Sequence, residues 1–552
     1  MSVMAYMPYG AGGIIIRVEA DIRRGIPGVD ITGLAEGAVR EARERVRAAF
    51  RNSGLSFPLD RILINLAPAG LRKDGAALDL PIALAVMAAA GLAPVPESLL
   101  VMGELELSGR IRPVRGVLAA IAAGLEEGIT EFIVPAENAR EAAILGGNEG
   151  GPGARFAAPA TLREALHALF TREESGELPM PAGSDGAADN ETDVRLRDAS
   201  AAGDFADVRG QDVYKRVLEI AAAGGHNVLA FGPPGAGKTM LARRLPSIMA
   251  PLSPDEAVEV TRLYSLAGPY KTGTTAGASH NGGFIDHLIT HPPFRAPHHS
   301  ASAEGILGGG RFPRPGEISL AHFGVLFLDE APEFRANVLQ ALREPLEDRM
   351  ISIVRAEGPV RLPAEFQLLL AANSCPCGRL GIRRPYGDLS EGDVTDAGCF
   401  CSPEEIYRYW RRFGGALLDR VELRVMVLPL KISELDRQDA GGERGVDTAK
   451  RVLAAVEIQR RRYRGMGIRR NALLPAGKLK SLCPMSTRAE TAFHKAMDKL
   501  GLSGRAYHGI LRVARTIADL ESRDMIDTVH ILEAVQHRRR GEDPFEILHA
   551  EN

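Results

Sequence analysis

The sequence of 552 residues predicts a multidomain α/β protein. A glycine-rich loop, 232–239, stands between a short apolar strand and the start of a helix. A second apolar strand, 324–328, ends in two acids, and beyond Gly441-Gly442 the apolar residues recur at helical spacing. At about 150 residues per domain, this length suggests three or four domains.

Four segments follow from the pattern along the chain. Residues 1–170 form an α/β unit, and 171–205 is an acidic stretch too poor in apolar residues to fold, so we expect a flexible linker. Residues 206–429 form a second α/β unit, and 430–552 is helical. In the first unit we expect strands at 14–18, 61–66 and 132–135, and helices at 35–52 and 78–90.

Charge and composition exclude several classes of protein. Lys and Arg total 67 and Asp and Glu total 70, so the net charge of −3 excludes a histone-like basic protein. Five cysteines are too few for a secreted disulfide scaffold. No basic residue precedes Arg17, and the longest apolar run, 80–96, is too short to span a bilayer. We expect a soluble cytoplasmic protein that does not enter a membrane.

The glycine-rich loop matches the phosphate-binding loop at every position. Its glycines allow backbone amides to surround phosphates at a helix N-terminus, while Lys238 supplies a charge and Thr239 a hydroxyl for Mg²⁺. A chance match is the alternative, but strand, loop and helix agree. The expected ATP-binding residues are Gly232, Pro233, Pro234, Gly235, Ala236, Gly237, Lys238, Thr239 and Met240.

The acidic strand end supplies the second half of this site. We expect Asp329 to lie on the metal side with Thr239, and Glu330 to act as the general base toward water. A third buried strand ends at Asn373, which could orient that water or could simply begin the turn into Ser374. The sequence thus predicts a hydrolase that uses ATP and Mg²⁺.

These residues resemble a known family. Together with the motifs above, 207–211, which includes Val208, is similar to the segment beside the adenine in AAA+ ATPases. More narrowly, the chain resembles the Mg-chelatase-like branch, the YifB/ComM proteins. That resemblance rests on 294–302, 308–310 and 313–322, and in the first unit on 28–33, 65–68 and 78–84.

The resemblance implies a ring, most simply a hexamer, with the active site between subunits. It implies that Arg420 completes the neighbour's site, since a guanidinium stabilises charge on the transferring phosphoryl group. Alternatively, Arg420 pairs with Asp419 or Glu422. Arg505, at the start of a lid helix, matches the second sensor arginine, which acts on its own subunit's ATP.

The first unit resembles the Lon protease domain. Ala77 stands where that protease has its nucleophilic serine, and Leu118 where it has the lysine of the dyad. A Ser–Lys dyad needs a hydroxyl and an amine, and neither position has one. The resemblance therefore implies a retained fold without proteolysis.

Four cysteines form two closely spaced pairs. Cys375 and Cys377 follow the third strand, and Cys399 and Cys401 lie some twenty residues further on. Two CxC pairs could provide a tetrahedral thiolate site for Zn²⁺, or they could be four reduced thiols without a ligand.

The choice of substrate rests on a hairpin. Two alternating segments within 349–363 predict a β-hairpin that carries Arg355 and Arg361. In similar ring helicases such an insertion enters the central pore and meets phosphates. The resemblance implies a DNA-dependent ATPase or helicase that promotes branch migration in recombination or natural transformation, with single-stranded or branched DNA as partner. The alternative is a chelatase-like ATPase that remodels a protein partner.

Overall fold

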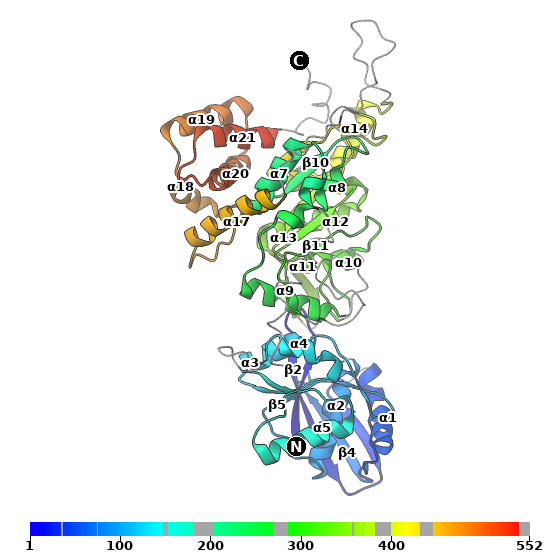
Figure 1. Cartoon of the computed structure of the whole chain (residues 1–552). Coiled ribbons are helices and arrows are strands. Elements are labelled where there is room, and N and C mark those ends of the chain that lie inside the picture. Colours follow the sequence, from blue (N-terminus) through cyan, green and yellow to red (C-terminus); the bar gives the residue numbers. More distant parts are fainter. Residues whose placement is uncertain are drawn as a thin grey trace.

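The computed structural model describes residues 1–34, 37–73, 75–146, 153–181, 204–268, 285, 287–310, 312–355, 358–380, 399–430 and 445–539. Three units follow one another along the chain (Figure 1). The first, coloured blue to cyan, lies at one end. The green second unit lies beside it, and the orange and red helices gather on one side of the second unit.

The first unit is built on a seven-stranded sheet in the order β3-β4-β2-β1-β5-β8-β9. Its strands are β1 (Ser2–Met7), β2 (Ile14–Arg23), β3 (Gly28–Thr32), β4 (Arg61–Ala67), β5 (Leu99–Val101), β8 (Glu131–Ile133) and β9 (Arg155–Ala157). A small hairpin pairs β6 (Glu104–Leu105) with β7 (Ile111–Arg112). The helices are α1 (Gly37–Asn52), α2 (Asp79–Ala89), α3 (Val117–Glu126), α4 (Ala139–Ala143) and α5 (Leu162–Ser175).

Burial explains these helices. Because α2 is apolar on every side, it is buried along nearly its whole length, whereas α1 buries only the stripe with Val39, Val46 and Phe50. Helix α5 begins at the cap residue Thr161 and ends at Ser175, beyond the boundary of 170 expected from the sequence. Leu178 is fully buried in the core of this unit, so the ordered part continues past the helix.

The second unit has a five-stranded parallel sheet in the order β11-β12-β15-β10-β16. Its strands are β10 (Val228–Phe231), β11 (Phe294–Arg295), β12 (Val325–Leu328), β15 (Gln367–Ala372) and β16 (Leu423–Met426). Its helices are α7 (Asp212–Gly224), α8 (Lys238–Ala242), α9 (Pro254–Ala267), α10 (Ala303–Leu307), α11 (Glu317–Leu320), α12 (Ala336–Ala341), α13 (Arg343–Asp348), α14 (Pro403–Trp410) and α15 (Gly415–Leu418). Strands β10 and β12 are apolar throughout because both faces of the sheet are covered, and β15 is apolar except for Gln367.

The expected hairpin is present as β13 (Met350–Arg355) and β14 (Gly358–Pro363). Ile351, Val360 and Leu362 are buried on one face, while Ser352 and Arg361 pair on the exposed face. The alternation of apolar and polar residues along the two strands therefore decides which side chains of the hairpin point away from the core.

The third unit contains α17 (Gly445–Arg462), α18 (Leu479–Leu482), α19 (Thr487–Leu500), α20 (Gly504–Leu520) and α21 (Thr528–Arg539). Helices α17 and α20 pack on α7 of the second unit and share one hydrophobic core with it. Within the core, the buried Asp519 binds Arg462 at 2.5 Å and Arg515 at 3.1 Å. Within the described ranges, no helix combines the length and apolar character needed to cross a membrane.

Helix α9 joins the second unit to the first. The Ser265 hydroxyl lies 2.5 Å from a carboxylate oxygen of Glu141, and the Gly116 N–H donates to the Ser265 carbonyl at 3.0 Å. Leu266 is buried within the hydrophobic core of the first unit. Burial raises the pKa of Glu141, while donation from Ser265 acts in the opposite direction. The end of α9 is therefore part of the first unit's interior.

We predict that Leu266→Ala destabilises the contact between the first two units by about 2–3 kcal/mol, because it removes a buried side chain and leaves a cavity. Thermal unfolding followed by circular dichroism should show a lower midpoint than for the wild type. Leu92→Ala, at a side chain that is 42% exposed, is the control. Equal midpoints for the two variants would contradict this role of α9.

Candidate nucleotide site and thiol cluster

The glycine-rich loop begins where β10 ends. Its backbone turns through positive φ values at Gly232 (156°), Gly235 (78°) and Gly237 (90°), which side chains other than glycine rarely adopt. A Cβ at Gly232 would lie 2.0 Å from the carbonyl oxygen of Val427, so no larger residue fits. Pro233 and Ala236 are buried, whereas Pro234, Gly235 and Met240 are exposed.

Lys238 is the first residue of α8 and is only 7% exposed. Its Nζ donates at 2.8 Å to the carbonyl oxygens of Gly232 and Pro233, and lies 3.4 Å from Oδ1 of Asn373. Burial lowers the pKa of Lys238 to about 8, while the charges of Asp329 and Glu330 act in the opposite direction. A phosphate here would supply the negative charge that the buried ammonium lacks.

Two oxygen groups lie together beside the lysine. The Thr239 hydroxyl donates to Oδ2 of Asp329 at 2.8 Å, and hydroxyl and carboxylate oxygens are the ligands that Mg²⁺ prefers. Glu330 has a positive φ of 50° and a 57% exposed carboxylate, 3.6 Å from Nδ1 of His299. It therefore points into solvent, where it can accept a proton from water.

The segment 207–211 also reaches this site. Val208 is buried in the core of the second unit. Gln211, with a φ of 57°, donates to the carbonyls of Ala236 at 3.0 Å and Leu428 at 2.7 Å. Gln211 thus ties the segment to the loop, a role that our sequence analysis missed although the residue lies within the quoted motif.

Arg420 and Arg505 meet at one acid. An Arg420 terminal nitrogen lies 2.5 Å from Oε1 of Glu347, and an Arg505 terminal nitrogen lies 2.7 Å from the same oxygen. Among the described residues, Arg420 thus forms its ion pair with Glu347, and not with Asp419 or Glu422. Arg505 lies with Arg420, whereas the sequence interpretation assigned the two arginines to different nucleotides.

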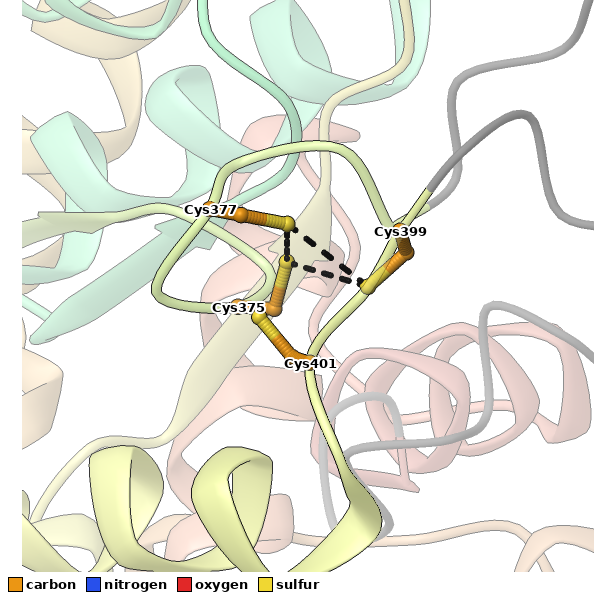
Figure 2. Close-up of side chains that lie close together, drawn as sticks. All are labelled: Cys375, Cys377, Cys399 and Cys401. Atoms are coloured by element: carbon orange, nitrogen blue, oxygen red, sulfur yellow. Dashed lines mark hydrogen bonds between the residues drawn. The ribbon is translucent and has the colours of Figure 1, made fainter.

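Four cysteines gather in one cluster just after β15 (Figure 2). The sulfur of Cys375 lies 3.4 Å from that of Cys377, and both lie 3.7 Å from that of Cys399. Together with Cys401, all four sulfurs lie within 4.8 Å of one another. A tetrahedron with Zn–S bonds of about 2.3 Å has edges of about 3.8 Å, so the cluster has the right dimensions for Zn²⁺.

No disulfide joins these four cysteines in the described structure. Burial opposes ionisation of Cys377, yet the Arg379 N–H and the thiols of Cys375 and Cys401 lower its pKa to about 7. Burial raises the pKa of Cys401 to about 11. The cluster therefore holds one thiol that ionises readily, Cys377, and one whose ionisation a bound cation would have to compensate, Cys401.

The expected DNA contacts are described in part. Arg361 is exposed on the hairpin, whereas the Arg355 side chain lies outside the described residues. Arg538, near the end of α21, is buried and donates to the carbonyl of Val421 at 2.6 Å, so this arginine belongs to the interior.

The first unit has no dyad at the positions that correspond to Lon. Leu118 is fully buried, and Ala77 packs against the core that contains Leu266 of α9. Neither side chain offers a nucleophile or a base.

Comparison with known proteins decides the family. The profile "Magnesium chelatase, subunit ChlI" matches residues 204–435, and profiles for "Subunit ChlI of Mg-chelatase" and for the ChlI C-terminal part match 18–138 and 442–538. YifB of Escherichia coli (strain K12) is 38% identical over 525 residues, covering 95% of this chain and 94% of its own length. The chain belongs to the magnesium chelatase ChlI family.

Further relatives narrow this placement. The competence protein ComM of Haemophilus influenzae is 37% identical over 531 residues, covering 96% of this chain and 95% of its own length. Lon protease of Salinispora arenicola is 29% identical over 164 residues, or 28% of this chain and 19% of its own length. This magnesium chelatase family protein is therefore a YifB/ComM homologue: an AAA+ ATPase with a Lon-like N-terminal domain and a helical C-terminal domain.

We predict that Gly232→Ala weakens binding of an ATP analogue by at least about fivefold, since the strain of an added Cβ costs roughly 1–3 kcal/mol. Fluorescence titration measures the affinity. Gly477→Ala is the control because no atom lies within 4 Å of a Cβ added there. Unchanged affinity in Gly232→Ala would mean that the loop relaxes around the new side chain.

Proposed function

We propose that this protein is an ATP-driven ring motor that acts on DNA. The observation that supports it best is the convergence of Lys238, Thr239, Asp329 and Asn373 at one edge of the parallel sheet, with Glu330 beside them. This set contains a cation for phosphates, oxygens for a metal and a base for water.

Each side chain has one task in this proposal. The loop amides and Lys238 bind the phosphates, Thr239 and Asp329 hold Mg²⁺, and Asn373 orients the water from which Glu330 accepts a proton. Bound Mg²⁺ neutralises charge on the phosphates. We further propose that the segment with the buried Val208 lies beside the adenine, and that Met240, in α8, completes the nucleotide-binding segment.

The two arginines support a ring. Because Arg420 and Arg505 bind the same carboxylate oxygen, they can reach the same place, and we propose that both act on the nucleotide of a neighbouring subunit, most simply in a hexamer. An arginine supplied by a neighbour makes hydrolysis depend on assembly.

The hairpin supports DNA as the substrate. Its exposed face carries Arg361, and Arg355 ends its first strand, so we propose that these two arginines contact the phosphates of DNA in the pore of the ring. A relative bears the name competence protein ComM. We therefore propose that the motor is a helicase that moves branched DNA during recombination or natural transformation.

We predict that single-stranded or branched DNA stimulates ATP hydrolysis, and that the double variant Arg355→Gln/Arg361→Gln loses this stimulation while basal hydrolysis persists. Steady-state ATPase assays at two salt concentrations measure it, because phosphate contacts weaken with salt. Arg488→Gln, at an exposed arginine outside the hairpin, is the matched control.

Lys238→Ala should abolish hydrolysis under every condition. Hydrolysis that ignores all DNA would overturn the DNA proposal and favour a chelatase-like ATPase that remodels a protein partner.

We also propose that the thiol cluster holds Zn²⁺. The sulfur spacings match a tetrahedral site, and bound Zn²⁺ would fix four thiolates at one point. We keep the expectation of a cytoplasmic location as a proposal, since a reducing compartment would leave these thiols available to a metal.

We predict about one zinc ion per chain in protein purified without chelators, measured by plasma emission spectrometry. Cys375→Ser/Cys377→Ser should lose the metal, while Cys483→Ser, which lies apart from the cluster, should retain it. Less than about 0.2 zinc per chain in the wild type would sink the proposal.

A further inference from the structure

One carboxylate binds both arginines that we place opposite a neighbour's nucleotide. Glu347 is 48% exposed, and its Oε1 lies 2.5 Å from Arg420 and 2.7 Å from Arg505. Two guanidinium groups repel each other at this separation, so a shared anion is what keeps them together. The arrangement of two cations around one anionic oxygen is also how arginines bind a phosphate.

The hold on Arg420 is tight. One of its terminal nitrogens binds Glu347, and the other donates to the carbonyl of Ala416 at 2.5 Å. The Arg420 side chain is only 13% exposed. To contact a phosphate, the Arg420 guanidinium therefore has to give up either the Glu347 carboxylate or the Ala416 carbonyl. The Glu347 carboxylate is the partner that a phosphate can replace, because its side chain is exposed to solvent.

Glu347 also lies at the base of the hairpin. It is in the last turn of α13, and β13 begins three residues later at Met350. The residue between them, Arg349, donates to the carbonyl of Leu473 in the helical unit at 3.3 Å. Only two residues thus separate the hairpin from the carboxylate that binds both arginines.

We propose that Glu347 is a positioning residue that holds Arg420 and Arg505 while the hairpin is empty and releases them to the neighbour's nucleotide when the hairpin binds DNA. The inference rests on the proposed function. It adds the element that couples DNA in the pore to hydrolysis in the next subunit.

Glu347→Gln in the full-length chain tests the proposal. The amide keeps the shape but loses the charge, so basal ATP hydrolysis without DNA should rise by roughly two- to fivefold, the population shift expected when a partly exposed ion pair is lost. The factor by which DNA stimulates hydrolysis should fall correspondingly. Glu344→Gln makes the same charge change on the same helix, at an exposed glutamate for which no ion pair is recorded in the described structure, and should match the wild type.

Glu347→Asp provides a second variant with the charge retained. Its carboxylate is withdrawn by roughly 1.5 Å, the length of one C–C bond, so it cannot bridge both guanidinium groups and should behave like Glu347→Gln. Circular dichroism and sedimentation velocity verify that both variants fold and assemble as the wild type does.

Subunit mixing shows whether the effect passes to a neighbour. Subunits with Lys238→Ala cannot hydrolyse ATP but still present Arg420. Wild-type subunits mixed with Lys238→Ala/Glu347→Gln subunits should hydrolyse faster than those mixed with Lys238→Ala subunits. A merely structural role for Glu347 would not produce this difference.

The outcomes separate the two proposals. Full activity of Arg420→Gln would overturn the role of the arginine, and absence of DNA stimulation in the wild type would overturn the DNA substrate. If Arg420→Gln is inactive while Glu347→Gln has wild-type or lower basal hydrolysis, the proposed hold by Glu347 is wrong.

Discussion

The parallel register between β10 and its neighbours is the constraint on which the site depends. Phe231 pairs with Ala372, so the loop that begins at Gly232 and the side chain of Asn373 leave the sheet side by side. Leu328 pairs with Leu370, which brings Asp329 to the same edge. Gly232, Asp329 and Asn373 are far from one another in the sequence. The ammonium of Lys238, the carboxylate of Asp329 and the amide of Asn373 meet because buried apolar strands fix where each chain segment emerges.

Helix α9 connects the unit that contains this sheet to the other two units. Near its start, Glu256 accepts from the N-cap of its own helix and lies 3.4 Å from Arg469 of the helical unit. At its end, Ser265 contacts Glu141 in the first unit. The same helix thus touches all three units. Because Leu266 is buried in the core of the Lon-like domain, that domain is held by the ATPase rather than attached only through the segment that joins them.

The family, the motifs and the hairpin could be predicted from the sequence because each depends on local residue order: glycines at fixed spacing, strands that end in acids, alternation around a turn. What could not be predicted are contacts between distant segments. Nothing near Arg420 in the chain indicates Glu347, and nothing in α9 distinguishes Leu266 from an ordinary core leucine. The end of the first unit, expected at residue 170, also lies further along the chain. The sequence did not indicate this, because Leu178 is an isolated apolar residue in a polar stretch and its burial depends on tertiary packing.

The thiol cluster is connected to the nucleotide site by position as well as by sequence. Asn373 precedes Cys375 by two residues, and the residue between them is fixed by the indole of Trp410, which donates to the Ser374 carbonyl at 3.1 Å. Gly378, just after Cys377, approaches Pro234 of the phosphate loop so closely that an added Cβ would lie 3.0 Å from it. A cross-link at the cysteines would therefore reduce the conformational freedom of Asn373. A metal bound by the four thiols would hold Asn373 still beside Lys238, and the water-orienting role that we propose for this amide requires such rigidity.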